Sequence, residues 1–414
     1  MAELYNLPDG WEWKKLNEVC KFIRGPFGGS LKKQIFKDSG NAVYEQSHAI
    51  YNQFEQIRYF IDDEKFEEMK RFELVPNSLI MSCSGTIGKV AIVPNNVKKG
   101  IINQALLMLI TNEKLNNIFL KLLIESNFFQ NLLSENSTGA AISNVASVKV
   151  LKEIQIPLPP IEEQKRIVAK LDNLFAKIDK AIALHQKNID EANVFMASVL
   201  NDVFVELEEK YEKKYLDEIS FLIDGDRGSN YPKKEEFFEN EFCLFLNAKN
   251  VTKNGFLFLE KQFITKEKDN ILRKGKLDRE DLIITTRGTI GNVSIYDKSI
   301  EFDNVRINSG MAIIRLKEKD LIYNRYIYKY LFAPQFLNYL SDVQSGSAQP
   351  QITIKNLKES IIPIPPLKTQ QKVVSYLDEI SQKMEKIKQI QKEKMQSLKA
   401  LKASILDQAF KGEL

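Results

Sequence analysis

Histidine and cysteine are scarce in this chain of 414 residues. It holds only two histidines, His48 and His185, which excludes a His-rich metal site and leaves only these two as partners for a catalytic nucleophile. The three cysteines, Cys20, Cys83 and Cys243, lie far apart and form no C-x-x-C pair, so neither zinc nor a disulfide framework is indicated. We expect no metal site, and a reducing, cytoplasmic environment.

Excess charge and long apolar runs are also absent. The 59 Lys and Arg residues nearly balance the 55 Asp and Glu residues, which leaves a net charge of +4. Any basic surface must therefore be local and offset by acidic residues elsewhere. The richest apolar stretch, residues 101–110, contains Asn103 and Gln104 and is too short to span a bilayer. We expect no membrane partner.

The motifs of the common enzyme classes are missing as well. The glycine-rich stretches GPFGGSLKK and GTIGKV do not match the P-loop pattern, and no G-x-G-x-x-G sequence follows a strand-like run. The G-x-S-x-G elbow is absent, and we find no convincing carboxylate cluster for a Mg²⁺ nuclease. We expect no cofactor and no catalytic residue of the chain's own.

What the sequence does contain is an internal repeat. KVLKEIQIPLPP at 149–160 matches KNLKESIIPIPP at 355–366, an offset of 206 residues. SCSGTIGKVAIV from Ser82 matches TTRGTIGNVSIY from Thr285, and ASVLNDVF at 197–204 matches ASILDQAF at 403–410. A repeat this long is a domain duplication rather than a solenoid. We infer two copies of one unit of about 200 residues, related by approximate two-fold symmetry.

Each copy contains a globular part followed by a helical part. Short strand-like runs alternate with glycine and asparagine turns in the globular part, and helical stretches follow at 115–135 and 322–342. The pattern predicts an α+β fold with two pseudo-symmetric globular domains and two long helices. The expected segments are 1–150 and 211–356 for the globular domains, and 151–210 and 357–414 for the helical regions.

The helical regions carry apolar residues at alternating spacings of four and three, which predicts a coiled-coil seam. Helices of about 40 residues are about 60 Å long and cannot be buried in their own small domains. A second helix that returns along the first makes the pair antiparallel. The expected seam residues are Val168, Leu171, Phe175, Ile178, Ile182, His185 and Ile189, then Val373, Leu377, Ile380, Met384, Ile387 and Leu398. His185 is either a polar seam residue that fixes register or a catalytic residue, and we favour the first interpretation.

Four segments carry a resemblance to a known family. They are LPDGWEWKKLNEV, the repeated GTIG, IPLPPIEEQKRIVAKLD and its second copy IPIPPLKTQQKVVSYLD. Together they resemble the specificity (S) subunit of type I restriction-modification systems, over essentially the whole chain. The second copy lacks the G-W opening of the first, so its start near Tyr215 is less well defined.

The resemblance implies a noncatalytic DNA-binding protein. The two globular domains would be target recognition domains, each reading one half of a bipartite, asymmetric sequence in double-stranded DNA. The two helices would form an antiparallel coiled coil that sets the half-site spacing. Two methyltransferase (M) subunits would bind the chain, and restriction (R) subunits would complete the nuclease.

Loops that differ between the copies supply the candidate DNA contacts. Gln and Asn can read adenine, Arg can read guanine, and Lys and Ser more often hold phosphate. The candidates are Arg24, Ser30, Lys32, Lys33, Gln46, Ser47, His48, Ser84 and Thr86, then Arg227, Ser229, Asn230, Tyr231, Asn247, Lys249, Arg287 and Thr289. Any one of them can equally be part of a solvated loop. GTIG itself can be a tight turn, a phosphate contact, or both.

Two other functions compete with the S-subunit interpretation. One is a stand-alone bipartite DNA-binding regulator or scaffold protein, which would bind its target tightly without partners. The other is an enzyme, either a nuclease or a fused methyltransferase–specificity protein, which the missing motifs and the duplication disfavour.

Overall fold

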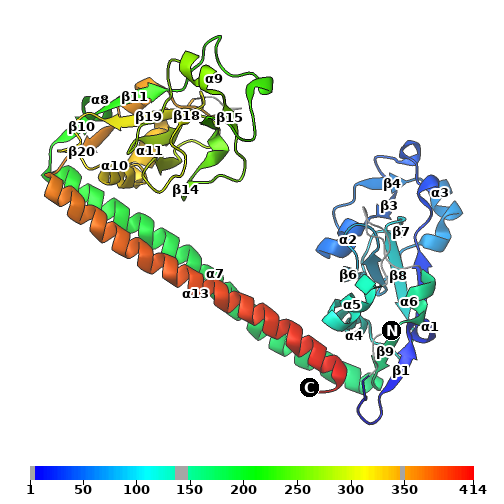
Figure 1. Ribbon diagram of the computed structural model, residues 1–414. Coiled ribbons are helices and arrows are strands. Elements are labelled where there is room, and N and C mark those ends of the chain that lie inside the picture. The colour runs from blue at the N-terminus through cyan, green and yellow to red at the C-terminus, as the bar shows by residue number, and fades with distance from the viewer. Residues whose placement is uncertain (1–4, 136–147, 346–349) are drawn as a thin grey trace. The chain divides into compact units, whose positions relative to one another are not determined.

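The computed structural model describes residues 5–135, 148–345 and 350–414 and divides the chain into two compact units. Unit 1 comprises Met1–Gln186 and Lys392–Leu414, and unit 2 comprises Lys187–Gln391. Each unit joins an α+β globular part to sections of both long helices (Figure 1), which confirms the expected fold class. The four segments expected along the chain stay predictions, because the units are defined by contacts and divide both helices.

The described residues of unit 1 form two sheets and a two-stranded ribbon. The strand order is β2–β8–β5–β6 in the first sheet, with all pairs antiparallel, and β4–β3–β7 in the second, where β3 and β7 are parallel. Strand β1 pairs with β9. The strands are β1 Glu12–Lys15, β2 Cys20–Arg24, β3 Asn41–Tyr44, β4 Tyr59–Ile61, β5 Leu79–Ser82, β6 Val90–Ile92, β7 Gly100–Ile102, β8 Leu106–Thr111 and β9 Gln155–Leu158. The short helices are α1 Leu16–Val19, α2 Gln46–Tyr51, α3 Asp63–Glu68, α4 Asn117–Glu125, α5 Asn127–Glu135 and α6 Val148–Glu153.

Unit 2 repeats this topology strand for strand and adds the hairpin β13–β14. Its sheets have the orders β11–β19–β16–β17 and β15–β12–β18, with β12 and β18 parallel, and β10 pairs with β20. The strands are β10 Lys213–Tyr215, β11 Ser220–Asp224, β12 Cys243–Leu246, β13 Val251–Thr252, β14 Gly255–Phe256, β15 Phe263–Ile264, β16 Leu282–Thr285, β17 Val293–Ile295, β18 Val305–Ile307, β19 Met311–Leu316 and β20 Ile361–Pro363. The short helices are α8 Leu216–Ile219, α9 Lys266–Ile271, α10 Asn324–Tyr330, α11 Pro334–Val343 and α12 Ile354–Lys358.

The central strands are buried on both faces. Successive side chains of a strand point to opposite faces, so Leu79 and Met81 on β5 join the cluster beside the helices, while Ile80 joins the cluster beneath the second sheet. On β16 in unit 2, Leu282 likewise joins the cluster on one face of the sheet and Ile283 joins the cluster on the other. The four-stranded sheet of each unit is therefore the middle layer of its domain.

The long helices, α7 (Ile161–Lys210) and α13 (Leu367–Lys411), contain 50 and 45 residues, or about 75 and 68 Å at 1.5 Å per residue. Neither contains glycine or proline, and a Pro-Pro pair precedes each. Gly412 directly follows α13, and its φ of +77° is the left-handed conformation that commonly terminates a helix. Within the described part of the chain, no helix has both the length and the apolar character needed to cross a membrane.

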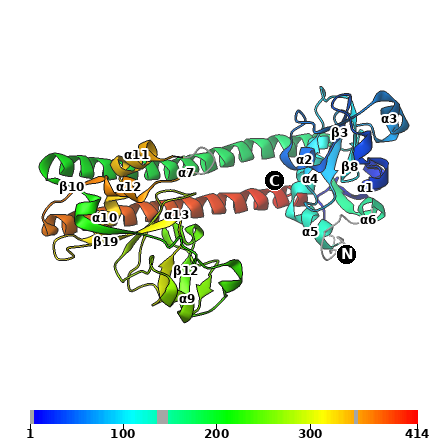
Figure 2. The ribbon, with the colours of Figure 1, turned by 90° about the horizontal axis from the view of Figure 1, so that it is seen from above.

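The two long helices pack antiparallel, side by side in both views (Figure 1 and Figure 2). Lys402 on α13 donates to Asp179 on α7 at 2.8 Å, and Lys388 donates to Asn193 at 3.2 Å. A later residue of α7 therefore contacts an earlier residue of α13, which is the order of an antiparallel pair. This pairing confirms the two packed long helices expected from the sequence.

The expected seam residues differ in how deeply they are buried. The buried seam residues are Val168, Leu171, Ile178, Ile189 and Leu377, and the half-buried ones are Phe175, Ile182, His185, Val373, Ile380, Met384 and Leu398. Ile387 is 39% exposed, and its place in the seam stays a prediction. The half-buried positions after Met384 continue through Lys388 and Gln391, at spacings of four and three.

Each globular core is closed by the last turns of a long helix. Phe410 near the end of α13 packs edge-on against Phe119 of α4, with ring centroids 5.1 Å apart. In unit 2, Phe204 near the end of α7 packs edge-on against Tyr330 of α10, also at 5.1 Å. Both phenylalanines are at most 1% exposed. The long helices are therefore part of the two domain cores.

Candidate nucleic-acid interface

Three loops of unit 1 meet at one end of the four-stranded sheet. They are the loop after β2, from Gly25 to Ser30, the turn after β5, from Ser84 to Gly88, and the turn before β8, residues 103–105. The strand register pairs Arg24 with Leu107 and Ser82 with Leu106, which places all three loops at the same sheet end. Backbone hydrogen bonds link them, including Cys83 N–H to the carbonyl of Ala105 at 2.9 Å.

Close approach of the first loop to the third requires glycine. A Cβ added at Gly25 would lie 1.8 Å from the carbonyl oxygen of Asn103. The side chain of Asn103 in turn accepts the N–H of Ala105 at 3.0 Å, which closes the turn. Backbone contacts thus hold the three loops to one another.

These loops surround a cavity of about 650 Å³ in unit 1. Its lining, among the described residues, is Arg24, Gly25, Pro26, Phe27, Ser30, Arg71, Phe72, Ser84, Gln104 and Ala105. Phe27 is 92% exposed, which is unusual for a phenylalanine. Burial raises the pKa of the Cys83 thiol below the cavity to about 11, and the Arg24 guanidinium acts in the opposite direction. An open cavity with two arginines, a glutamine and an exposed ring suits contact with nucleic-acid phosphates and base edges.

Unit 2 builds the same three loops with the same backbone contacts. A Cβ at Gly225 would lie 2.1 Å from the carbonyl oxygen of Asn308. Asn308 accepts the N–H of Gly310 at 2.9 Å, and Thr286 N–H donates to the carbonyl of Gly310 at 2.8 Å. The duplication has therefore preserved the loop framework while the side chains on it have changed.

Charge is arranged differently on the loops of unit 2. Arg227 donates to Asp224 and to the carbonyl of Ser309, both at 3.2 Å. Asp226 is buried and accepts the N–H of Arg273 at 2.8 Å and that of Gly228 at 3.0 Å. The backbone hydrogen bond from Arg273 is the main reason why the pKa of Asp226 lies below its usual value. Asp226 therefore clamps the loop that carries Arg227.

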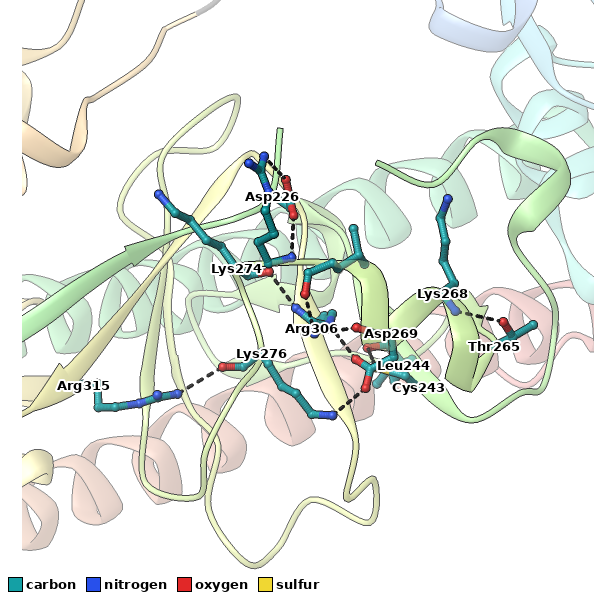
Figure 3. A network of polar contacts seen from close by, with 12 residues as sticks. Asp226, Cys243, Leu244, Thr265, Lys268, Asp269, Lys274, Lys276, Arg306 and Arg315 are labelled. Atoms are coloured by element: carbon teal, nitrogen blue, oxygen red, sulfur yellow. Dashed lines mark hydrogen bonds and ion pairs between the residues drawn. The ribbon is translucent and has the colours of Figure 1, made fainter. Parts of the chain in front are cut away.

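A buried ionic network holds the segment around Arg273, to which Asp226 is bonded (Figure 3). Arg306 on β18 points toward Asp269 on α9, and both side chains are at most 6% exposed. Arg306 also donates to the carbonyls of Leu272 at 3.1 Å and Lys274 at 2.7 Å, the two neighbours of Arg273. Arg306 therefore fixes the segment that holds Asp226.

The remaining candidates of unit 1 fall into two groups. Lys32 and Lys33 are exposed next to the first loop, whereas Gln46 and Ser47 on α2 are half-buried. His48, also on α2, is only 1% exposed, with its Nδ1 within hydrogen-bond distance of the backbone of Glu45. Among the described residues, α2 contributes nothing to the lining of the cavity. His48 is therefore not available for direct contact with DNA in this structure.

The other candidates of unit 2 lie on its loops. Ser229 and Asn230 are exposed beside Arg227, and Tyr231 is half-buried against Phe245. Asn247 is half-buried and accepts the N–H of Lys249 at 2.9 Å. Lys249 is exposed and pairs with Glu260 at 2.9 Å. The side chains of Asn247 and Lys249 are thus already engaged within the chain.

The repeated GTIG is a tight turn in both units. Its glycines, Gly85, Gly88, Gly288 and Gly291, all have φ between +68° and +82°. Thr86 and Thr289 are exposed between them, and Arg287 is half-buried, with its backbone paired to that of Gln351. The turn accounts for the glycines, and contact of its N–H groups with phosphate stays a prediction.

Sequence reasoning missed several residues of the loop surfaces: Phe27, Arg71 and Gln104 in unit 1, and Arg273 and Ser309 in unit 2. A signal was present for Gln104 and Ser309. INQA at 102–105 and INSG at 307–310 repeat the same Asn turn, with the variable residue directly after the asparagine. Arg71 and Phe72 follow α3, and only the folded chain brings them to the cavity.

A family model described as the type I restriction modification DNA specificity domain matches the chain twice, at residues 8–193 and 208–394. The putative type I restriction enzyme MjaX specificity subunit of Methanocaldococcus jannaschii is 25% identical, over 96% of this chain and 93% of that protein. The EcoKI specificity subunit of Escherichia coli K12 is 27% identical, over 70% of this chain and 64% of that protein.

Two solved structures share the fold. The HsdS subunit from Thermoanaerobacter tengcongensis has a TM-score of 0.55 and 23% identity, covering 99% of both chains. A chain described for the complex assembly and conformational transition of the type I R-M system has a TM-score of 0.73 and 23% identity, covering 99% of this chain and 100% of its own length.

Proposed function

The chain belongs to the type I restriction-modification DNA specificity family, and from this premise we propose that it reads a bipartite, asymmetric DNA sequence for a type I restriction-modification enzyme. As a specificity subunit it is a noncatalytic part of that enzyme. One observation carries the proposal. Both units present three loops on the same backbone framework, yet the side chains on those loops differ.

Different side chains on one framework suit an asymmetric target. Unit 1 offers Arg24, Gln104 and the exposed ring of Phe27, whereas unit 2 offers an Arg227 that is oriented by Asp224. Arginine pairs with guanine and glutamine with adenine in the major groove. A homodimer would read a palindrome, but two diverged domains in one chain read two different half-sites.

The long helices give the chain its second task in this proposal. They set the separation of the two half-sites and provide the docking sites of two methyltransferase subunits, through which restriction subunits join. The mixed charge of both helices is compatible with such a role. Since the substrate is chromosomal or invading DNA, we place the assembly in the cytoplasm.

The test is assembly followed by methylation. We expect the chain, co-expressed with its methyltransferase subunit, to form a complex with two methyltransferase subunits per chain and to methylate one asymmetric bipartite sequence. Methylation-sensitive sequencing of the host DNA reads out that sequence, and the methyltransferase subunit alone is the control. Tight specific DNA binding by the chain alone, without complex formation, would instead favour a stand-alone regulator.

The exposed lysines beside the first loop yield a prediction on salt dependence. Lys32→Ala with Lys33→Ala should weaken DNA binding about equally for cognate and unrelated duplexes. The plot of log K against log salt has a negative slope, and each lost phosphate contact makes it less steep by about 0.9. The slope of the double variant should therefore be less steep by about 1.8. Fluorescence anisotropy between about 50 and 200 mM salt measures this slope.

Gln104→Ala is the matched control for that measurement. Because Gln104 is exposed in the cavity between the loops, its loss should relax the sequence requirement at one base pair and leave the salt slope unchanged. An unchanged slope in the lysine variant would remove both lysines from the set of phosphate contacts. An unchanged methylated sequence in the Gln104 variant would remove Gln104 from the base-reading set.

A further inference from the structure

Two buried glutamines occupy equivalent places in the two units. Gln164 is the fourth residue of α7 and Gln370 is the fourth residue of α13, and each is 0% exposed. Both stand in the repeated P-P-x-x-x-Q segment. A buried amide needs hydrogen-bond partners, and each glutamine makes three hydrogen bonds.

Gln164 joins the start of α7 to the globular part of unit 1. Its Nε2 donates to the carbonyl of Lys114 and to that of Pro159, both at 2.8 Å. Its Oε1 accepts the N–H of Asn116 at 2.8 Å. One amide thus satisfies two carbonyls and one N–H, two of which lie in the loop that leads into α4.

Gln370 makes the same three bonds in unit 2. Its Nε2 donates to the carbonyls of Leu321 at 3.0 Å and Pro365 at 2.8 Å, and its Oε1 accepts the N–H of Tyr323 at 2.8 Å. The loop at 321–323 leads directly into α10. Among side chains of this length, only glutamine supplies two donors and an acceptor from one planar group.

These bonds add to the apolar packing that attaches each globular part to the helix pair. Helix α4 touches the end of α13 through Phe119 and Phe410, and the loop before it is bonded to the start of α7 through Gln164. Helix α10 is attached in the same way through Phe204 and Gln370. Apolar packing is non-directional and tolerates small rotations of the domain, whereas hydrogen bonds are directional and favour one orientation.

We propose that Gln164 and Gln370 are positioning residues that fix the orientation of each recognition domain about the helix pair, and thereby select the number of base pairs between the two half-sites. This inference rests on the proposed function. One base pair turns B-DNA by about 34–36°, since a helical turn takes 10–10.5 base pairs. A domain held at one angle discriminates against a spacer that is one base pair too long or too short, because its half-site is then rotated away from it.

The variants are Gln164→Met and Gln370→Met, which keep the length of the side chain but remove all three hydrogen bonds. Gln130→Met is the control, since Gln130 donates to the carbonyls of Ile124 and Gly88, both within the globular part. Gln370→Met repeats the test in unit 2 independently.

The first readout is the distance between two nitroxide labels in the full chain. Labels at Lys37→Cys and Lys177→Cys, both exposed and both in unit 1, report the orientation of the globular part on α7, and the three native cysteines are buried. Gln164→Met should broaden the distance distribution, and Gln130→Met should leave it as in the parent chain. An unchanged width in Gln164→Met would overturn the proposal.

The second readout is methylation by the assembled complex on duplexes with the native spacer and with one base pair more or fewer. The preference for the native spacer should fall about tenfold in Gln164→Met and Gln370→Met, in keeping with the loss of several buried hydrogen bonds. A broadened distance with unchanged spacer preference would overturn the spacing role, as would an equal loss in Gln130→Met. If the parent complex methylates no bipartite site, the proposed function is wrong. The label distances still test separately whether the glutamines fix the orientation of the globular parts.

Discussion

Phe410→Ala is expected to lower the free energy of unfolding of unit 1 by about 3–5 kcal/mol, the usual cost of truncating a fully buried phenylalanine. Phe410 is 1% exposed, packs on Phe119, and its carbonyl accepts the hydroxyl of Tyr5 at 2.6 Å. The last turn of α13 is therefore part of the core of a domain that begins at the other end of the chain. Hydrogen exchange of peptides from β5 and β8 measures the effect in unit 1.

Phe204→Ala and Phe195→Ala are the matched controls. Phe204 is 0% exposed against Tyr330, so its loss should accelerate exchange in β16 and β19 of unit 2 instead. Phe195 is 49% exposed on the same helix, and its replacement should change stability by less than about 0.5 kcal/mol. Faster exchange in β16 and β19 of the Phe410 variant, with β5 and β8 unaffected, would contradict the assignment of Phe410 to unit 1.

Asp269→Ala should destabilise unit 2 by a similar amount, about 3–5 kcal/mol, because it leaves the buried guanidinium of Arg306 without its counter-charge. Arg306 is only 5% exposed and cannot reach solvent without moving β18 or α9. The same change should weaken the hydrogen bond from the Arg273 N–H to Asp226, because Arg306 holds the carbonyls on both sides of Arg273. Faster exchange in the loop at 224–231 would report that weakening.

The double variant Asp269→Leu with Arg306→Met is the informative partner of this measurement. Replacing both members of a buried ion pair by apolar residues is often neutral, so most of the lost stability should return. Lys276, the other partner of Asp269, is 44% exposed and can turn to water. If the double variant is as unstable as Asp269→Ala, the buried pair itself is not the cause of the loss.

The stability of unit 2 at acid pH distinguishes the contribution of the Asp269 charge from that of side-chain packing. Burial acts to raise the pKa of Asp269, but hydrogen bonds from Lys276 and Arg306 outweigh it and hold the pKa below its usual value. A carboxylate with a lowered pKa stabilises the fold above the unfolded-state pKa of about 3.9, and that stability is lost as the pH falls through the folded-state pKa. Unit 2 of the parent chain should therefore lose more stability below about pH 4 than the double variant does.

The features that followed from the sequence are those written into short segments or repeated along the chain. The duplication is visible because KVLKEIQIPLPP returns as KNLKESIIPIPP, and the long helices are visible because apolar residues recur at spacings of four and three without glycine or proline. The loop framework was partly visible too. Arg24, Ser30 and Ser84 were all candidates, and these three line one cavity.

What the sequence did not reveal depends on contacts between distant residues. The helix expected at 115–135 breaks at Ser126, where Asp407 on α13 accepts the N–H of Asn127 at 3.0 Å. The break in the stretch at 322–342 is different, because Pro334, the first residue of α11, is a local signal for it. Neither the burial of His48 nor the exposure of Ile387 could be read from local pattern, because each depends on which neighbour covers that position.

The sequence by itself therefore determined the duplication, the α+β class, the two long helices and the family, since periodicity, turn residues and motifs are properties of neighbouring residues. Only the tertiary structure decided which residues meet. It brought Phe410 to Phe119, joined Gln164 to the loop before α4, and placed Arg306 beside the segment that is bonded to Asp226. Such contacts join segments tens to hundreds of residues apart, and they form because the folded core must bury apolar surface and satisfy every buried polar group.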